Sequence, residues 1–587
     1  MLRNFTICFL FCLTACGGEQ SAVLDTDGQA PTIEPSPYVV AAAHPLAAEA
    51  GLEMLARGGT AVDAAIAVQA VLSLVEPQSS GLAGGAFMLH FDPATNDLTS
   101  YDGREIAPAS ASPDMFLKED GSPMGFYDAV TGGRSVGVPG VIAMLAMAHE
   151  RHGNLDWETL LEPALRHARD GFAVTPRLHE SIMRMATRGR LAQSEKAAAY
   201  FLDADGEPWP VGHVLKNPAY VTTLQYLIDE GPAVFYAGPV ADEIALAVNE
   251  AAGVATLTAD DFLAYEPLKR EPVCAKYAGK RICSMAPPSS GGVTLLQILL
   301  LLEQTDFALQ APGSATAWHL LLEASRLAYA DRNIFLADPV AMSSDTYSAD
   351  DLIQSLLLPA YLAERSSLIK KDVSSIEVSA GDPIAYIGRE GRQPGQDASP
   401  EPPSTSHFSI MDSQGRVVSM TTSVEFPFGS HLMAGGMILN NQLTDFSFQP
   451  IRDGEPVLNA VAPGKRPRSS MSPVIILNED GTVYGALGSP GGSAIIGYVA
   501  KTLVALLNWN LTLQEAIDEP NIVVPRGGVL VEDDTLDEAR LADLEVFGHT
   551  IQQQDLTSGI YGFVLNADGG IDRGADKRRE GVVLTGP

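Results

Sequence analysis

Ser404-Thr405-Ser406-His407-Phe408-Ser409 marks the point where a proline-rich segment gives way to β-strand patterns. Four prolines between residues 394 and 403 lack the backbone N–H that a sheet ladder requires, so residues 386–403 are predicted to form an exposed loop. From residue 405 onward, two alternating runs flank Asp412-Ser413-Gln414-Gly415. This pattern predicts a β-hairpin that begins directly after the loop.

Thr405 would occupy the first position of that hairpin. If the chain were cut before it, the new α-amine would lie beside the threonine hydroxyl and act as its general base, which activates a weak nucleophile. A hydroxyl-rich strand entry is also common on surface sheets. Six residues alone do not decide between these two interpretations.

The composition is that of a large globular protein. Of 587 residues, 46% are hydrophobic and 19% are charged, which is ample for a large core. The formal net charge of −34 disfavours nucleic acid and anionic membrane surfaces as main partners. We therefore expect no nucleic-acid partner.

The N-terminus has the pattern of an export signal. A basic start is followed by an apolar run at residues 5–13, which is too short to span a bilayer. Leu13-Thr14-Ala15-Cys16 resembles a bacterial lipoprotein signal, in which cleavage precedes Cys16 and lipid is attached to its thiol; an ordinary secretory peptide is the alternative. We predict a signal peptide at 1–15, a flexible tether at 16–36 and an exported, periplasmic protein that contacts the membrane only through the lipid on Cys16.

Two cysteines lie in the predicted mature body. Cys274 and Cys283 bracket a hairpin pattern with its turn near Ala278-Gly279, so they can face each other across two strands. Whether they are bonded is open at this point. The eleven histidines are scattered without the spacing of a metal site, and no metal or other cofactor is predicted.

Hydrophobic periodicity predicts helices and strands in successive zones of the chain. Helices are predicted at residues 45–57 and 62–74, the second apolar on all sides, and a glycine turn leads into a strand that ends near residue 91. Residues 140–270 are predicted to be mostly helical and 293–335 to hold two helices. Strands are predicted at 416–424, 435–439, 474–477, 483–487 and 562–565. Together these zones indicate sheets covered by helices.

Seven short blocks, in order along the chain, carry a resemblance to a known family. They are GGTAVDAA (58–65), DGREIAP (102–108), PPSSGG (287–292), TSHFS (405–409), LNNQLTDFS (439–447), PRSSMSP (467–473) and GSPGGS (488–493). Over residues 38–587 the chain resembles the γ-glutamyltransferases, also called glutathione hydrolases, of the N-terminal-nucleophile hydrolase superfamily. The resemblance implies an α/β fold, a four-layer αββα sandwich. It also implies a precursor that cuts itself into a large subunit, 37–404, and a small catalytic subunit, 405–587, which stay together.

The resemblance also implies a catalytic apparatus. The Thr405 hydroxyl would attack the Ser404 carbonyl, release a new N-terminus, and then attack the γ-carbonyl of a glutamyl amide. Gly491 and Gly492 would supply backbone N–H groups to the oxyanion. His407 is expected to be structural, within its strand.

The substrate contacts follow from the charges of a γ-glutamyl group. Arg104 would bind the α-carboxylate in a bidentate fork, with hydroxyls from Ser469 and Ser470 as further donors. Asp445 and Gln442 would accept hydrogen bonds from the ammonium.

The sequence departs from the family pattern at two of the implied site positions. Ser423 and Glu425 occupy a position pair where the family has a T-x-N arrangement. Ser423 keeps a hydroxyl beside Thr405, whereas Glu425 adds a carboxylate that tightens ammonium binding or alters the substrate.

Three functions follow from these observations. The first is a γ-glutamyl hydrolase or transferase that uses glutathione or related amides and passes the acyl group to water, an amino acid or a peptide. The second is a glutaryl-type amidohydrolase resembling cephalosporin acylases, which is disfavoured because a glutaryl group has no amine for Asp445. The third, from another class, is an uncleaved, inactive lipoprotein scaffold.

Overall fold

A computed structural model describes residues 37–188, 190–253, 256–389, 392–525 and 527–587. The predicted signal peptide, lipid anchor and tether fall on residues 1–36 and lie outside the described residues. In the part of the chain that is described, no helix is long and apolar enough to cross a membrane.

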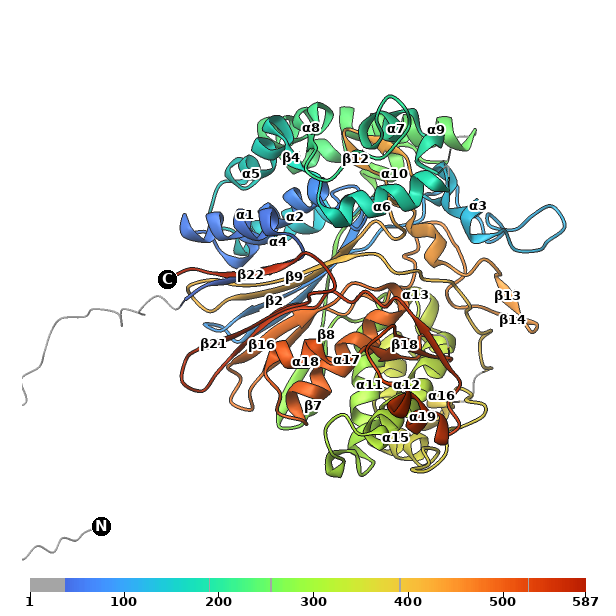
Figure 1. Ribbon diagram of the computed structural model, residues 1–587. Coiled ribbons are helices and arrows are strands. Elements are labelled where there is room, and N and C mark those ends of the chain that lie inside the picture. The colour runs from blue at the N-terminus through green and yellow to red at the C-terminus, as the bar shows by residue number, and fades with distance from the viewer. Residues whose placement is uncertain (1–36, 189, 254–255, 390–391, 526) are drawn as a thin grey trace, which may run out of the picture. The chain divides into compact units, whose positions relative to one another are not determined.

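Two antiparallel sheets form the centre of the body (Figure 1). The first has seven strands in the order β22 (Val582–Thr585), β1 (Val39–Ala42), β9 (Ser406–Met411), β10 (Val417–Ser423), β2 (Gly85–Asp92), β3 (Asp97–Gly103) and β6 (Leu268–Arg270). The second has six in the order β21 (Ile571–Ala575), β20 (Tyr561–Leu565), β16 (Val483–Gly488), β15 (Val474–Leu477), β8 (Lys280–Ser284) and β7 (Val273–Tyr277). One buried cluster joins the sheets and includes Leu89, Val417, Ile475 and Phe563.

Helices cover the outer face of each sheet (Figure 1). The face of the first sheet that carries Phe408 and Met420 packs in one core with α1 (Pro45–Ala56), α2 (Ala61–Val75), α4 (Val141–His152), α5 (Trp157–Asp170) and α8 (Pro218–Glu230). The second sheet packs on α11 (Gly291–Glu303), α12 (Ala315–Phe335), α17 (Ile495–Leu507) and α18 (Leu513–Asp518). Because strand side chains alternate between faces, each sheet has one face for its helices and one for the other sheet. The predicted αββα sandwich is confirmed.

The remaining elements are short or peripheral. They are α3 (Phe126–Val130), α6 (Pro176–Thr187), α7 (Glu195–Phe201), α9 (Pro239–Ala252), α10 (Ala259–Leu263), α13 (Pro339–Met342), α14 (Ala349–Leu356), α15 (Pro359–Ser366), α16 (Pro383–Tyr386), α19 (Glu538–Val546), β4 (Phe172–Ala173), β5 (Val214–Leu215), β11 (Met433–Ala434), β12 (Met437–Ile438), β13 (Ile451–Arg452), β14 (Glu455–Pro456), β17 (Ile522–Val523), β18 (Val529–Glu532) and β19 (Ile551–Gln554).

Strands from the two sides of the Ser404–Thr405 bond are interleaved. β1, which precedes the bond in sequence, pairs with β22 on one side and with β9 on the other, and both of these follow it. β10 likewise pairs with β2 from the N-terminal portion. A cut before Thr405 would therefore leave neither piece with a complete first sheet.

Most of the predicted elements are confirmed, with two differences. The predicted helices 45–57 and 62–74 are α1 and α2, and all residues of α2 are buried. The predicted strand 435–439 is only the two-residue β12, because Gly435 and Gly436 have positive φ angles of 55° and 71° and turn the chain. The strand-rich segment after residue 405 also contains α17, α18 and α19, which were not predicted.

Cys274 and Cys283 form a disulfide across the paired strands β7 and β8. The pairing brings Tyr277 opposite Lys280, so the turn at Ala278-Gly279 has the position that the sequence predicts. The question left open by the sequence is thereby answered for this structure.

Candidate active site

Thr405 lies just before β9 in a strained backbone conformation. Its φ angle is +92°, a region that a β-branched residue rarely adopts, and the residue is 4% exposed. Its Oγ1 lies 3.1 Å from Oγ of Ser423, the last residue of β10. Glu401 and Glu425, close by in the site, also have positive φ angles of 40° and 80°. Backbone strain of this kind concentrates at functional sites because the surrounding structure has to enforce it.

Ser423 links Thr405 to the backbone of Glu425. Ser423 Oγ accepts a hydrogen bond of 2.9 Å from the Glu425 N–H. The serine hydroxyl proton is therefore free to be donated to Thr405 Oγ1, or the oxygen can accept from it. The structure brings the predicted pair of hydroxyls together.

One of the two predicted oxyanion glycines contacts the Ser404–Thr405 peptide bond. The Gly491 N–H, after β16, donates a hydrogen bond of 3.0 Å to the carbonyl oxygen of Ser404. A Cβ on Gly492 would lie 2.4 Å from the Pro402 oxygen, so only glycine permits this close approach. One predicted donor thus already polarises the carbonyl that Thr405 would attack; the role of Gly492 as a second donor stays a prediction.

Arg104, which follows β3, is completely buried and largely committed to partners within the protein. Its Nη2 donates to Asp445 Oδ2 at 2.5 Å and to the Arg468 carbonyl oxygen at 2.8 Å, and its Nε donates to the Pro467 carbonyl oxygen at 3.1 Å. The predicted bidentate fork to a substrate carboxylate stays a prediction, since in the uncut chain these partners occupy Nε and Nη2. Nη1 lacks a hydrogen-bond partner among the described residues and lies 3.6 Å from Glu105 Oε2.

Among the residues that line the pocket, two further polar atoms lack a partner in the described part of the chain. They are the acceptor oxygens Gln442 Oε1 and Glu425 Oε1. Gln442 Nε2 donates to Asp445 Oδ2 at 2.6 Å, which fixes the amide orientation and leaves Oε1 as its free end. Buried polar groups normally have partners, so one orphan donor and two orphan acceptors in one site call for a ligand with both kinds of group.

Burial controls the charge of the acidic side chains here. Burial, and secondly the charge of Asp445, raises the pKa of Glu425 well above its usual range. Burial also raises the pKa of Glu105 to about 8 and raises the pKa of Asp445. In both cases the positive charge of Arg104 opposes the shift. A cation bound at Glu425 would lower the pKa of that carboxyl again, because a nearby opposite charge favours the carboxylate.

The segment before Thr405 is a loop, as predicted, with exposed residues such as Gln393 and Pro403, but its acidic side chains are buried in the site, which the prediction missed. Asp397, Glu401 and Ser404 are at most 5% exposed. The Glu401 carboxylate accepts hydrogen bonds from Arg332 on α12, Arg468 and Ser470. Proline-rich composition excludes sheet pairing, but it does not detect ion pairs to arginines far away in sequence.

The two predicted serines differ in their partners. Ser470 Oγ donates to Glu401 Oε2 at 2.6 Å and accepts from Arg332 Nη2 at 2.7 Å. Its hydroxyl therefore already acts as donor and as acceptor within the chain. Ser469 Oγ accepts from the Met471 N–H at 3.1 Å, which leaves its own proton free. Only Ser469 is ready to donate to a substrate in this state.

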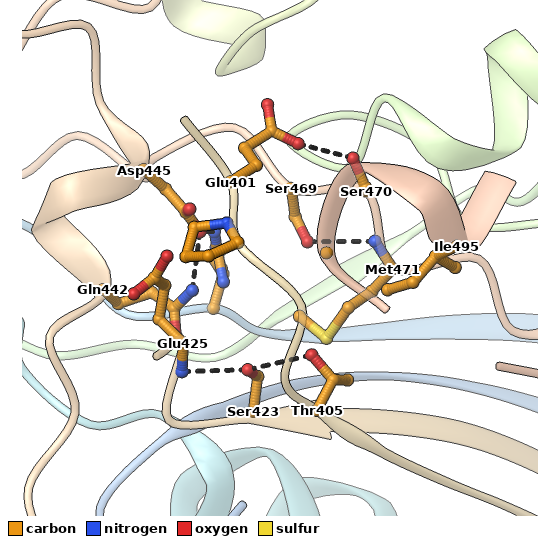
Figure 2. Close-up of a pocket in the computed structure, with 13 residues that line it drawn as sticks. Glu401, Thr405, Ser423, Glu425, Gln442, Asp445, Ser469, Ser470, Met471 and Ile495 are labelled. Atoms are coloured by element: carbon orange, nitrogen blue, oxygen red, sulfur yellow. Dashed lines mark hydrogen bonds and ion pairs between the residues drawn. The ribbon is translucent and has the colours of Figure 1, made fainter. Parts of the chain in front are cut away.

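Figure 2 shows the site, with Thr405 and Ser423 side by side and Glu401 pointing toward Ser470. The free space among the lining side chains is about 20 Å³, which is room for about one water molecule. A glutamyl group does not fit while the segment up to residue 404 lies there.

Several site residues were not predicted from the sequence. They are Arg332, Glu401 and Arg468 in the carboxylate network and Arg579, whose Nη1 donates to the Thr405 carbonyl oxygen at 2.9 Å. The signals were weak: Arg468 stands inside the PRSSMSP block and Glu401 is an acidic residue among prolines. His407, as predicted, is buried in its strand, where it contacts Thr421 and Ser409.

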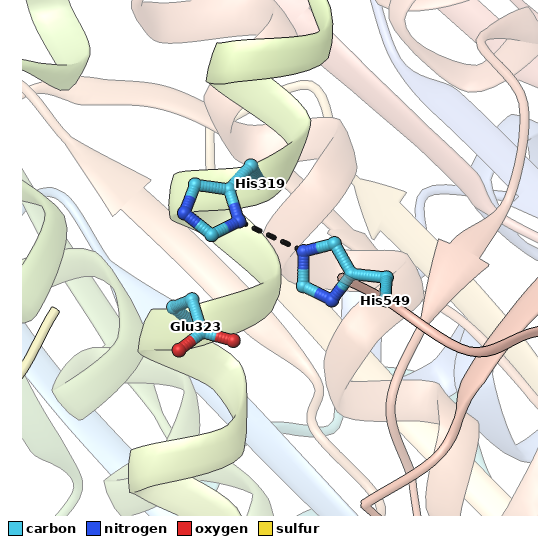
Figure 3. A group of neighbouring side chains, drawn as sticks. All are labelled: His319, Glu323 and His549. Carbon is cyan, nitrogen blue, oxygen red and sulfur yellow. Dashed lines mark hydrogen bonds between the residues drawn. The ribbon is translucent and has the colours of Figure 1, made fainter. Parts of the chain in front are cut away.

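A group with metal-ligand chemistry lies outside the site (Figure 3). His319 and Glu323 on α12 approach His549, and all three are buried. His319 Nδ1 lies 2.8 Å from His549 Nε2, while the Glu323 carboxylate accepts from Arg326 and from the Ser375 N–H. Because the facing atoms already form hydrogen bonds, the group is accounted for as a polar network within the core. That the protein needs no metal stays a prediction.

Comparison with known proteins gives consistent results. The family described as gamma-glutamyltranspeptidase matches residues 47–586. The glutathione hydrolase proenzyme of Bacillus subtilis (strain 168) is 35% identical over 554 residues, which is 93% of this chain and 91% of that protein. A crystal structure of cephalosporin acylase from Bacillus halodurans shares the fold with a TM-score of 0.80 at 24% identity, covering 96% of this chain and 99% of the other. The gamma-glutamyltranspeptidase of Helicobacter pylori has a TM-score of 0.55 at 28% identity, covering 60% of this chain and 97% of the other.

Proposed function

The chain belongs to the gamma-glutamyltranspeptidase family, and on that premise we propose that it cuts itself before Thr405 and then hydrolyses or transfers γ-glutamyl groups, with glutathione as a substrate. The acceptor of the acyl group is water, an amino acid or a peptide. The cut gives a large subunit, 37–404, and a small subunit, 405–587.

Self-cleavage begins with attack of Thr405 Oγ1 on the Ser404 carbonyl carbon. The Oγ–C bond forms, the C–N bond of the peptide breaks, and the hydroxyl proton passes to the departing α-amine. Water then hydrolyses the ester, which leaves a carboxylate on Ser404 and a free amine on Thr405. The Gly491 N–H, 3.0 Å from the Ser404 oxygen, stabilises the developing oxyanion. The positive φ of Thr405 favours the reaction, because cleavage releases that strain.

Turnover uses the same oxygen a second time. Thr405 Oγ1 attacks the γ-carbonyl of a glutamyl amide while the Thr405 α-amine accepts the hydroxyl proton and passes it to the leaving amine. The γ-glutamyl ester is then attacked by water or by an acceptor amine, which restores the hydroxyl. Ser423 holds Thr405 Oγ1 in place, and Gly491 and Gly492 supply the oxyanion contacts.

The buried polar atoms without hydrogen-bond partners favour a γ-glutamyl group over a glutaryl group as the acyl part of the substrate. Gln442 Oε1 and Glu425 Oε1 are acceptors that an ammonium satisfies, and Arg104 Nη1 with the Ser469 hydroxyl are donors for a carboxylate. A glutaryl group would leave both acceptors buried without a partner, which costs about 1–3 kcal/mol for each. An inactive scaffold has no need of the strained Thr405 or of the Gly491 contact.

Self-cleavage is tested by a denaturing gel and intact mass of the purified protein beside a Thr405→Ala variant. The protein has 587 residues and a mass of 62.1 kDa, so the 183 residues from Thr405 onward should give a band at about 19 kDa in the parent only. Sequencing of that band should begin at Thr405. A single uncut chain in both samples would favour the scaffold, and a cut parent that turns over glutaryl but not γ-glutamyl anilides would favour the acylase.

We also propose that the protein is exported and anchored through lipid on Cys16. The signal-like N-terminus supports this, and so does the Cys274–Cys283 disulfide, since disulfides persist in oxidising compartments. Cys16→Ser should move the protein from the membrane fraction to the soluble periplasmic fraction. Retention in the membrane fraction would contradict the anchor.

A further inference from the structure

Two buried arginines beside the site hold a carboxylate that belongs to the chain itself. Arg332 Nη2 lies 2.7 Å from Glu401 Oε1 and 2.5 Å from Oε2, and Arg468 Nη2 lies 2.9 Å from Oε1. Ser470 completes the contacts with a hydrogen bond of 2.6 Å to Oε2. All three carboxylate-binding residues are at most 5% exposed, so this is a desolvated, pre-organised carboxylate site.

The acidic partners of these arginines come from the segment that precedes the proposed cut. Arg468 Nη2 also lies 2.8 Å from Asp397 Oδ2. Within the described residues, Asp397 and Glu401 are the carboxylates that form ion pairs with Arg332 or Arg468. Cleavage after Ser404 makes this segment a free chain end, with Glu401 three residues from the new terminus.

The segment has to leave before a substrate can bind. The free space of about 20 Å³ admits no acyl group while Glu401 and Pro402 line the site. When Glu401 withdraws, Arg332 loses its counter-charge and Arg468 keeps at most Asp397, which is unfavourable until another anion replaces Glu401. The other arginine of the site, Arg104, keeps Asp445.

The charges indicate which anion replaces Glu401. The α-carboxylate and ammonium of a γ-glutamyl group sum to zero, and Arg104 Nη1, Ser469, Gln442 and Glu425 offer them partners. Even with Asp397 on Arg468, one of the two guanidinium charges remains uncompensated, so a second carboxylate on the substrate is favoured. The two sites adjoin, because the Arg468 carbonyl accepts from Arg104 while the Arg468 side chain binds Glu401.

We propose that Arg332, Arg468 and Ser470 form a second carboxylate subsite, which Glu401 occupies in the uncut chain and which takes a carboxylate on the leaving-group side of the substrate in the cut enzyme. The inference rests on the proposed function and names its substrate class: γ-glutamyl amides whose leaving group is itself acidic, as the peptide leaving group of glutathione is.

The test compares two chromogenic substrates of the cut enzyme. γ-Glutamyl-p-nitroanilide has a neutral leaving group, and γ-glutamyl-3-carboxy-4-nitroanilide carries a carboxylate on it. The parent enzyme should have a KM about tenfold lower for the carboxylated substrate. Equal KM values would overturn the subsite and leave the proposed function intact, whereas no turnover of either substrate would overturn both.

An Arg468→Met variant locates the effect. Its kcat/KM should fall about tenfold more for the carboxylated substrate than for the plain anilide, and Arg468→Lys should recover part of the difference because it restores the charge but not the planar fork. Arg573→Met, which removes an exposed arginine of β21, serves as the matched control and should show no such difference. Equal losses on both substrates would show that Arg468 supports the acyl side or the fold and would overturn the proposal. If Arg468→Met does not accumulate as cut protein, the KM ratio of the parent enzyme decides.

Discussion

Two arginine clusters meet in one site, and they differ in where their acidic partners come from. Arg104 is paired with Asp445, and both belong to the body of the molecule before and after the proposed cut. Arg332 and Arg468 are paired with Glu401 and Asp397, which belong to the segment that ends at the scissile bond. We call Arg104 with Asp445 the permanent cluster. Arg332 and Arg468, with their partners from the cut segment, are the removable cluster.

The difference shows how one chain can meet two requirements. A precursor has to fold with every buried charge compensated, because an unpaired buried charge is strongly destabilising. An enzyme needs charges that are free for a substrate. The removable cluster satisfies the first requirement with Glu401 and the second after cleavage. The permanent cluster holds Gln442, a proposed substrate contact, through Asp445, which the cut does not remove.

The largest effect is expected from breaking the permanent cluster with Asp445→Asn. The change leaves buried Arg104 with only the more distant Glu105 as a carboxylate partner, and it removes the negative charge that stabilises the substrate ammonium. We expect kcat/KM for a γ-glutamyl anilide to fall about 100-fold, or about 3 kcal/mol, with a much smaller loss for a glutaryl anilide. Asp453→Asn, in the turn between β13 and β14, is the control. Equal losses on the two substrates would contradict the ammonium assignment.

Breaking the removable cluster should affect only the uncut protein. In a Thr405→Ala background, Glu401→Gln should lower the free energy of unfolding at pH 7 by about 2–3 kcal/mol, measured by urea denaturation. Although burial alone would raise it, Arg332 and Arg468 hold the pKa of Glu401 below its usual range. The stabilisation is therefore fully present above the unfolded pKa of about 4.3, declines as the pH falls below that value, and is gone only below the lowered pKa of the folded state.

The two Glu401 proteins should accordingly converge in stability at low pH. In the cut enzyme, the same Glu401→Gln change should alter the melting temperature by no more than about 1 °C, since the segment has left the site. A loss in the cut enzyme as large as that in the uncut protein would show that Glu401 stays in place.

A smaller effect is expected from Arg104→Lys. A lysine keeps the charge, but its single ammonium cannot make the guanidinium's contacts with Asp445, Pro467 and Arg468 and still have a donor left for the substrate. We expect KM for the γ-glutamyl anilide to rise about tenfold with a lesser change in kcat. An unchanged KM would remove Arg104 from the substrate contacts.

Local pattern predicted the scaffold better than it predicted the charges. α2 and the β9–β10 hairpin were predicted correctly because the hydrophobic periodicity that indicates them depends only on residues close in sequence. The family resemblance placed Thr405, Ser423 and Gly491 together. The Glu401 network was out of reach, because Arg332 and Arg468 lie 69 and 67 residues from Glu401 in sequence and none of the three is unusual locally. For the same reason the prediction of an exposed loop at 386–403 missed the burial of Asp397 and Glu401 within it.

The interleaved first sheet has a consequence for how the mature enzyme persists. Because β1 is hydrogen-bonded between β22 and β9, the two pieces are not partners in an association equilibrium, and dilution should not separate them. They part only when the sheet itself unfolds. The covalent link that guided the strands into that order is by then gone, so the lifetime of the enzyme is set by its rate of unfolding rather than by an equilibrium constant.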